Sequence, residues 1–288
     1  MCRVELTLKG YAVRDKMRIT LFRYLLNLSL FVLIVAPATH ARTLTMTLAG
    51  EETHVDVTAP TANHGLFSFH GAVILAHGFT RARETMAGHA VTLARDGYWV
   101  VVPDLPYVMD SRDNAVALRD LIQQLQHGAA GEPLDRFVLV GFSAGGLSAL
   151  LAADAPGVVG YVGLDPFDRP GGVGLEAARK LTIPAFLLRG PSAACNAYSI
   201  AEPWVKALPN LVEDRQFAAA SHCDFESPTD RVCTFVCGAT NPQNQAAVVE
   251  FLRRSVRRAM PPDSRPGSVA RPAQGKVGEV PDQSQDEP

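Results

Sequence analysis

One serine in the sequence is flanked by glycines in a pattern that suits nucleophilic chemistry. Ser143 stands between Gly141 and Gly145 in the stretch LVGFSAGGLSAL, where one apolar run gives way to a second run of helical period. A Gly-x-Ser-x-Gly sequence at the end of a strand makes a strained turn into a helix that exposes the serine oxygen, and its glycines avoid collisions with neighbouring backbone. A turn of small residues that only lets a helix and a strand pack closely is the alternative. The motif predicts that Ser143 is a nucleophile.

A serine hydroxyl needs a base to take its proton, and the histidines offer one candidate. Of the eight histidines, only His222 follows Ser143, and after a strand-to-helix turn of this kind the base comes later in the chain than the serine. His222 lies in ASHCDF, just past the last expected strand. His77 precedes the serine, and we expect it to brace a loop. We therefore predict that His222 is the base.

A carboxylate and two backbone donors would complete the chemistry. The stretch YVGLDPFD ends a strand with Asp165, and Asp168 is the reserve candidate for the acid that fixes the histidine tautomer. The expected donors to an oxyanion are the backbone N–H groups of Ala144, which follows the serine, and of Phe79 in the turn HGFT.

Other side chains near these turns each have two interpretations. Arg81 and Arg83 could meet an anionic group of a substrate, but we expect them to be exposed to solvent. Four aromatic residues flank the predicted loops and are either walls of a substrate pocket or ordinary core residues: Phe79, Phe142, Phe167 and Tyr198.

The elements that would position these residues alternate along the chain. Apolar runs typical of strands lie at residues 43–50, 53–58, 71–78, 98–104, 136–141, 158–165, 183–190 and 214–221. Helical periodicity lies at residues 82–96, 113–127, 144–154, 202–208 and 242–258. This order predicts an α/β fold with a mostly parallel central sheet of about eight strands, helices on both faces and ligands at the carboxyl ends of the strands. The interval between residues 165 and 183 is too short for a large cap domain, and we interpret this interval, with its RPGGVG, as a flexible loop near the acid.

Composition and the two ends of the chain set the limits of the folded unit. With 47% hydrophobic residues and a net charge of −2, the 288-residue chain suits one domain at residues 42–260 and carries no basic excess for a nucleic-acid partner.

Residues 1–41, with a possible start at Met17, have the basic, apolar and small-residue regions of an export signal. We expect a periplasmic or extracellular protein without a stable membrane span after cleavage, with an uncleaved anchor as the alternative. Residues 261–288 are rich in proline, glycine and charge and predict a disordered tail.

Four cysteines lie beyond the predicted signal, and an oxidising compartment would favour two disulfides between them. They are Cys195, Cys223, Cys233 and Cys237. Three pairings are possible, and we favour Cys195–Cys223 with Cys233–Cys237, because the first two lie in loops expected to follow neighbouring strands. A zinc site formed by His222 and these thiols is the alternative, although the spacing matches no common zinc pattern.

The quoted motifs resemble those of a known family. From about residue 71 to residue 225 the sequence resembles α/β-hydrolases of the branch that contains chlorophyllases, dienelactone hydrolases, cutinases and platelet-activating-factor acetylhydrolases. AHGFT resembles the oxyanion loop and GFSAGG the nucleophile turn, while VGLDPFD and SHCDF resemble the acid and base segments of chlorophyllases.

The sequence also departs from individual members of this branch. Phe142 and Ala144 stand where chlorophyllases typically have His and Arg, dienelactone hydrolases in the strict sense use cysteine, and the acid comes earlier than in cutinases.

The resemblance implies hydrolysis of a small-molecule or lipid-like carboxylic ester through an acyl-serine. It assigns the reaction to Ser143, Asp165 and His222, with no metal and no organic cofactor. A non-catalytic binding protein on the same fold, and a peptidase or acyltransferase with the same three side chains, are the alternatives.

Overall fold

The computed structural model describes residues 41–61 and 71–261. Apart from residues 41 and 261, the predicted export signal and the predicted tail lie outside the described residues. All described residues belong to one compact unit, which begins at Ala41. Within these described ranges, no helix is long and apolar enough to cross a membrane.

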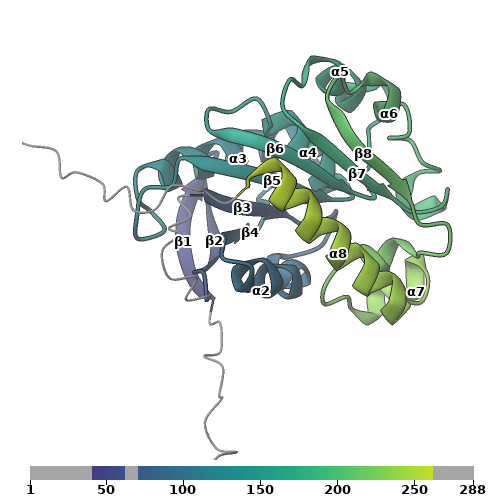
Figure 1. Cartoon of the computed structure of the whole chain (residues 1–288), viewed down its shortest axis with the longest axis horizontal. Coiled ribbons are helices and arrows are strands. Elements are labelled where there is room, and N and C mark those ends of the chain that lie inside the picture. Colours follow the sequence, from purple (N-terminus) through teal and green to yellow (C-terminus); the bar gives the residue numbers. More distant parts are fainter. Residues whose placement is uncertain (1–40, 62–70, 262–288) are drawn as a thin grey trace, which may run out of the picture. The chain divides into compact units, whose positions relative to one another are not determined.

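The centre of the fold is one eight-stranded sheet (Figure 1). Its strands are β1 (Arg42–Leu48), β2 (Glu51–Thr58), β3 (Gly71–Ala76), β4 (Trp99–Pro103), β5 (Arg136–Phe142), β6 (Val158–Leu164), β7 (Ala185–Arg189) and β8 (Leu211–Gln216). They lie in the order β1-β2-β4-β3-β5-β6-β7-β8. Strand β2 pairs antiparallel with β1 and β4, and the other neighbouring pairs are parallel. The predicted mostly parallel sheet is confirmed.

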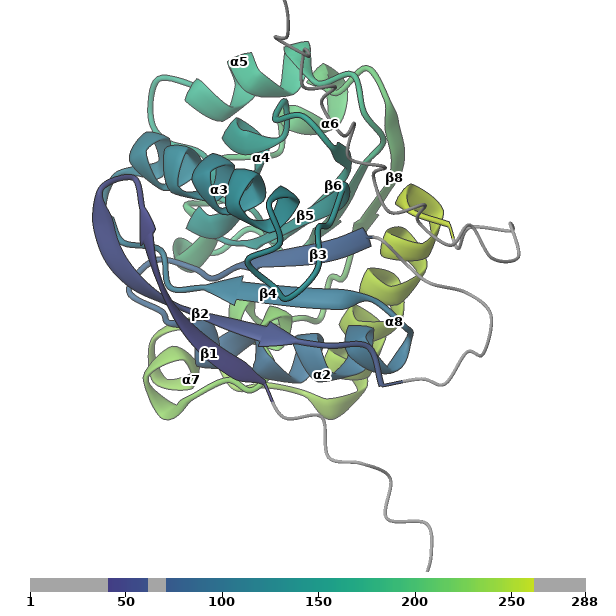
Figure 2. The ribbon, with the colours of Figure 1, turned by 90° about the vertical axis from the view of Figure 1, so that its left-hand side faces the viewer.

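Helices cover both faces of this sheet (Figure 2). The α-helices are α2 (Ala87–Arg95), α3 (Ser111–Gln126), α4 (Ala144–Ala152), α5 (Val173–Lys180), α6 (Trp204–Ala207), α7 (Arg231–Cys237) and α8 (Pro242–Ala259). The described residues also form the short 3-10 helices η1 (Arg83–Met86), η2 (Ala194–Asn196) and η3 (His222–Phe225).

Side chains along the central strands alternate between two hydrophobic cores. In β3, Ala72 and Ile74 pack in the core that includes buried residues of α3 and α4, whereas Val73 and Leu75 pack in the core that includes those of α2 and α8. Figure 2 shows α3 on one side of the sheet and α2 with α8 on the other. Because both faces are buried, the central strands are continuous apolar runs, which made them predictable.

Two details of the predicted elements are wrong, namely the bounds of the last strand and the absence of a helix between residues 165 and 183. The last strand is β8 at Leu211–Gln216 instead of residues 214–221, because this edge strand is only partly buried and lacks the apolar run of a central strand. The interval predicted as a flexible loop contains α5. The start of α5 is stabilised by an acid that precedes it in the chain, since the Gly174 and Leu175 N–H groups donate to the Asp168 carboxylate at 2.9 and 3.0 Å.

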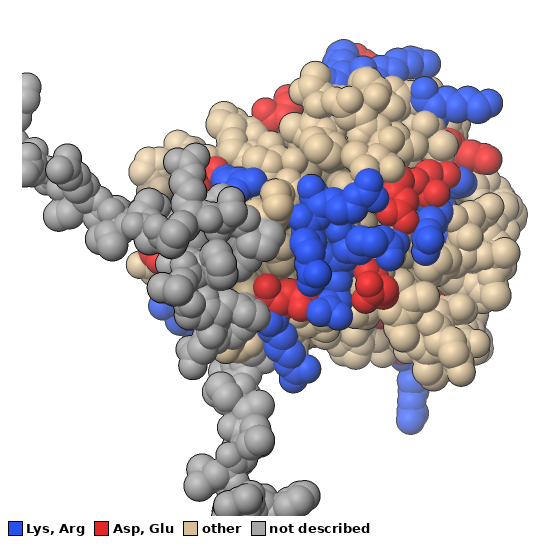
Figure 3. Space-filling view, in the orientation of Figure 1, with Lys and Arg blue, Asp and Glu red and all other residues tan. Residues whose placement is uncertain are grey.

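The outer face of α8 carries basic side chains that lie beside acidic ones (Figure 3). Arg254 and Arg258 contact the Glu213 carboxylate of β8 at 2.9 and 3.0 Å, and Arg253 binds the Asp96 carboxylate after α2 at 2.6 and 2.7 Å. These contacts fasten α8 to the elements on either side of it.

Candidate active site

Ser143 lies in a strained turn between β5 and α4. Its backbone has φ 52° and ψ −121°, values that side-chain-bearing residues seldom adopt. Glycines on either side make the turn possible. A Cβ atom at Gly145 would lie 2.2 Å from the His77 carbonyl oxygen, and one at Gly141 would lie 2.3 Å from the Gly145 carbonyl oxygen. The turn holds the serine at the carboxyl end of the sheet, as the motif predicts.

The structure brings His222, Asp165 and Ser143 together in one hydrogen-bonded chain. His222 Nδ1 lies 2.6 Å from Asp165 Oδ2, and His222 Nε2 lies 3.0 Å from Ser143 Oγ. An ionised carboxylate only accepts hydrogen bonds, so Nδ1 donates to it, and Nε2 is left to accept the serine proton. All three residues are buried, with relative exposures of 7% for Ser143, 3% for Asp165 and 8% for His222.

Asp165 follows β6 and is held by groups besides the histidine. Its Oδ1 accepts the Gly190 N–H at 2.8 Å, and the side-chain amide of Asn196 lies 3.2 and 3.3 Å from the two carboxylate oxygens. The reserve acid, Asp168, points elsewhere and accepts the indole N–H of Trp204 at 2.8 Å. The structure therefore places Asp165 at the histidine and Asp168 in the support of α5 and α6.

Asn196 was missed by the sequence analysis. It lies in the loop after β7, which reaches the carboxyl end of the sheet, and this position is the one signal that could have pointed to it. Its side-chain oxygen accepts the N–H groups of Ala193 and Ser199, both at 3.0 Å, so the amide that faces Asp165 has a fixed orientation.

The turn that carries Phe79 is braced by His77. The ring Nε2 accepts the Leu105 N–H at 2.9 Å, which leaves Nδ1 to donate to the Gly78 carbonyl, also at 2.9 Å. Burial lowers the pKa of His77, so the neutral ring that these contacts require is favoured. The expected bracing role is thus confirmed by its contacts. Phe79 and Ala144 both line the cavity that contains Ser143.

A cavity of about 380 Å³ opens beside Ser143, within the range of small-molecule sites. Phe167 forms part of its wall, together with apolar residues of the loop after β4 that are largely exposed, Val108 at 61% and Met109 at 66%. Of the other proposed wall residues, Phe142 is buried against the His222 ring with centroids 4.6 Å apart, and Tyr198 is 74% exposed outside the cavity walls.

Comparison with known proteins identifies the family. The sequence profile of the α/β hydrolase family matches residues 73–273, more than half of the chain. The chain belongs to the α/β hydrolase family. No curated protein sequence matches it.

Two solved structures resemble the fold of this α/β hydrolase. Ferulic acid esterase from Streptomyces cinnamoneus shares 18% identity at a TM-score of 0.59, over 84% of this chain and 96% of its own. XC6422 from Xanthomonas campestris, an α/β serine hydrolase without a lid, shares 18% identity at a TM-score of 0.55, over 77% of this chain and 96% of its own. At this level of identity the likeness shows the fold.

Arg81 and Arg83 of the hydrolase are held in ion pairs, so the expectation that they are exposed to solvent was wrong. Arg81 is 11% exposed and binds Glu226, whose hydrogen bonds raise the pKa of the guanidinium further above its ordinary value. Arg83 is 19% exposed and contacts the carboxylates of Asp56 and Asp104 at 3.2 and 2.5 Å. Their carboxylate partners explain the burial.

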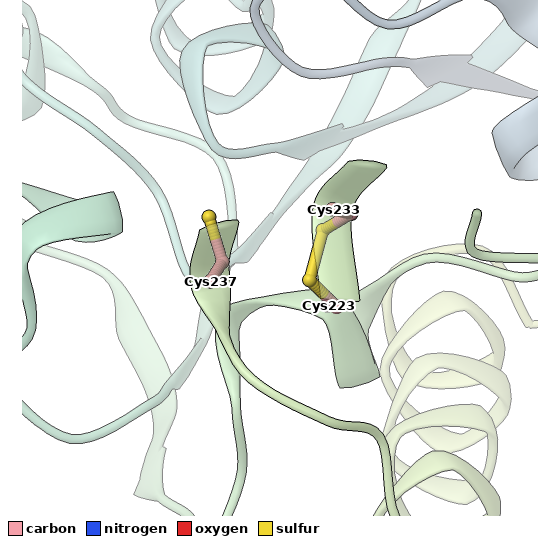
Figure 4. A group of neighbouring side chains, drawn as sticks. All are labelled: Cys223, Cys233 and Cys237. Atoms are coloured by element: carbon pink, nitrogen blue, oxygen red, sulfur yellow. A yellow bond between two sulfur atoms is a disulfide. The ribbon is translucent and has the colours of Figure 1, made fainter. Parts of the chain in front are cut away.

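The favoured disulfide pairing was also wrong, because the structure pairs Cys195 with Cys237 and Cys223 with Cys233. Figure 4 shows η3 beside α7, with Cys223 joined to Cys233 and Cys237 close by. Cys233 and Cys237 lie about one helical turn apart on α7. They are not bonded to each other, because Cys233 is bonded to Cys223 and Cys237 to Cys195. The sulfur atoms of Cys223, Cys233 and Cys237 lie within 4.8 Å of one another. A metal could use them only after reduction, and His222 already faces Ser143 and Asp165.

Proposed function

We propose that this α/β hydrolase is an exported serine esterase that cleaves carboxylic esters through an acyl-serine intermediate. The observation that carries the proposal is the hydrogen-bonded chain from Asp165 through His222 to Ser143, at 2.6 and 3.0 Å. A buried serine next to an oriented imidazole acceptor is the arrangement that activates a hydroxyl for attack on a carbonyl carbon.

The mechanism follows from these positions. His222 Nε2 takes the Ser143 proton as the serine oxygen attacks the ester carbonyl, while Asp165 stabilises the imidazolium. The N–H groups of Phe79 and Ala144 donate to the oxyanion. His222 then protonates the leaving alcohol, and the acyl group stays on Ser143. A water molecule, deprotonated by His222, attacks the acyl carbon; His222 then returns this proton to the Ser143 oxygen as the acid is released.

The cavity favours an ester with an apolar acyl or alcohol part. Its walls include Phe79, Phe167, Leu105, Val108 and Met109. These suit a small aromatic or lipid-like ester. The esterase activity named for the Streptomyces neighbour belongs to the same reaction class.

Two disulfides support export to the periplasm or the cell exterior, since such bonds persist in oxidising compartments. Under this proposal residues 1–41 are the export signal, residues 42–260 the catalytic domain and residues 261–288 a tail.

The test is labelling with a fluorophosphonate, which reacts with activated serines, followed by hydrolysis of p-nitrophenyl esters of increasing acyl length. We expect the wild type to label and to hydrolyse esters. Ser143→Ala and His222→Ala should each lose labelling and lower kcat by about 10⁴-fold or more, because the nucleophile or its base is gone.

Matched controls separate a lost reaction from a damaged fold. Ser255→Ala removes another buried serine, on α8, and His54→Ala removes an exposed histidine on β2. Both should keep labelling and kcat. A Ser143→Ala variant as active as the wild type would contradict the assignment of the nucleophile. A folded wild type that neither labels nor hydrolyses any ester would favour a non-catalytic binding protein.

A further inference from the structure

Two loops that meet at the active site are joined by one buried ion pair. The turn after β3 contains Phe79 and ends at Arg81, and η3, which begins with His222, is followed directly by Glu226. Arg81 Nε lies 2.6 Å from Glu226 Oε1, and Arg81 Nη2 lies 2.9 Å from Oε2. The Glu226 side chain has no solvent exposure and that of Arg81 only 11%. The contact links two segments 145 residues apart in the chain.

Glu226 is fixed on its own side of this contact. Its Oε2 also accepts the Thr229 hydroxyl at 3.1 Å. The backbone on both sides of it is anchored, since the Phe225 carbonyl lies 3.0 Å from His89 Nε2 and the Ser227 carbonyl accepts the Gly88 N–H at 2.6 Å. The loop that carries Glu226 therefore keeps its place without the arginine.

The turn that carries Phe79 is braced at its start, where His77 Nδ1 donates to the Gly78 carbonyl at 2.9 Å, but it has fewer fixed points on the side of the histidine loop. Its Arg81 N–H donates to the Gly78 carbonyl at 3.2 Å, and Thr80 adopts a positive φ of 54°. Phe79 itself is 49% exposed, so little packing holds it. The Arg81 side chain is thus the main anchor of the turn on the side of the histidine loop, and Asp230 assists it at 3.0 Å from Nη1.

We propose that Arg81 and Glu226 are positioning residues, whose ion pair holds the Phe79 N–H at a fixed place relative to His222 and Ser143. The inference rests on the proposed ester hydrolysis. A buried ion pair adds little net stability compared with apolar residues of similar volume, because desolvation offsets the attraction. Its bidentate geometry does fix direction. An oxyanion donor that moves by about 1 Å costs up to about 100-fold in rate.

The test separates positioning from stability with single and double variants. Arg81→Met and Glu226→Leu should each lower the free energy of unfolding. The first leaves the buried Glu226 carboxylate without its cation, and the second leaves the Arg81 guanidinium with the half-exposed Asp230 alone. The double variant, Arg81→Met with Glu226→Leu, removes both charges and should recover most of that stability. We expect its kcat for a short p-nitrophenyl ester to remain about 10- to 100-fold below the wild type, with little change in KM.

A transition-state analogue reports on the oxyanion donors directly. A boronic acid adds to the serine oxygen as a tetrahedral anion, and its affinity for the double variant should fall by the same factor as kcat. The matched control is Arg253→Met with Asp96→Leu, which removes another bidentate pair, between α8 and the end of α2. This control should leave kcat and the boronate affinity unchanged.

The conservative variant Arg81→Lys keeps the charge but loses the two-pronged contact, and it covers the case in which the double variant does not fold. Its kcat should fall with KM unchanged. Wild-type kcat in a folded double variant, or in Arg81→Lys, would overturn the inference and leave the esterase proposal intact. A folded wild type that neither reacts with a fluorophosphonate nor hydrolyses any ester would instead overturn the esterase proposal, and this inference with it.

Discussion

Two of the residues assigned to the chemistry have strained backbone conformations. Ser143 and Asp165 follow neighbouring parallel strands, and both have positive φ, at 52° and 40°. Such conformations cost about 1 to 3 kcal/mol each and persist only where surrounding contacts fix them. Here the Ser143 N–H donates to the Leu164 carbonyl at 3.0 Å, and the Asp165 N–H donates to the Leu188 carbonyl at 2.7 Å. The strain turns both side chains toward the histidine loop.

The two acids of this region make a matched pair for a residue-scale prediction. Asp165→Asn should lower kcat by about 10⁴-fold, because an amide no longer stabilises the imidazolium and favours the wrong tautomer. Asp168→Asn should leave kcat within a few-fold of the wild type but lower the free energy of unfolding by about 3 kcal/mol, since Asp168 supports Trp204 and the start of α5. Steady-state kinetics and urea unfolding of both variants make the comparison. The reverse pattern would make Asp168 the catalytic acid.

At the scale of elements, burial decides how well the sequence predicts the structure. The central strands β3 and β5 are buried on both faces and are continuous apolar runs, so the sheet and the turn at Ser143 were predictable. Strand β8 was misplaced because its side chains are partly exposed. Helix α7 was not predicted: it is only seven residues long, and its Val232, Phe235 and Val236, although spaced as on one helix face, are exposed at 66%, 91% and 66% instead of facing the core.

Contacts between distant segments were beyond sequence reasoning for another reason. The positions of Ser143 and His222 follow from a motif and from chain order, but nothing local in the sequence shows that Glu226 meets Arg81 or that Asn196 meets Asp165. The disulfide pairing failed in the same way, because it depends on how α7 lies against η2 and η3.

The two disulfides hold α7, and they should contribute unequally to stability. Cys195–Cys237 spans 42 residues and Cys223–Cys233 spans 10. By loop entropy in the unfolded chain, removal of the first should cost about 4 kcal/mol and removal of the second about 3 kcal/mol. Urea unfolding of Cys195→Ser/Cys237→Ser and of Cys223→Ser/Cys233→Ser measures both values.

Paired substitutions are needed in this experiment. A single Cys195→Ser variant would leave the Cys237 thiol within 4.8 Å of the other disulfide, where exchange can occur. Peptide mapping of that single variant should find Cys237 joined to Cys223 or Cys233 in part of the protein. Equal stability of the two double variants and the wild type would contradict the loop-entropy expectation.

At the scale of the whole molecule, two buried neutral histidines link stability to pH. Burial lowers the pKa of His77 and of His89, which are 5% and 1% exposed. In the described part of the chain, His89 has no hydrogen-bond partner at Nδ1, so a proton there would be buried without an acceptor. Both rings are therefore neutral in the folded protein at a pH where the unfolded chain already protonates them.

The sign of the pH dependence follows from this difference. Below the ordinary histidine pKa of 6.5 the unfolded state binds more protons than the folded state, so the free energy of unfolding should fall as the pH is lowered. The slope should approach about 1.4 kcal/mol per pH unit for each histidine. Above pH 6.5 this contribution is complete and no longer changes with pH. Urea unfolding measured from about pH 7.5, roughly one unit above the ordinary histidine pKa, down to about pH 5, roughly 1.5 units below it, follows the effect.

A variant that keeps the hydrogen bond but cannot titrate isolates one of the two groups. His89→Gln retains a side-chain N–H that can donate to the Phe225 carbonyl, the partner of His89 Nε2. Below pH 6.5 the free energy of unfolding of this variant should change less with pH than that of the wild type, because one fewer histidine takes up a proton on unfolding. His54→Gln, at an exposed histidine of β2, should leave the slope unchanged. A wild type whose stability is flat across this range would mean that both buried rings take up protons in the folded state as readily as in the unfolded chain.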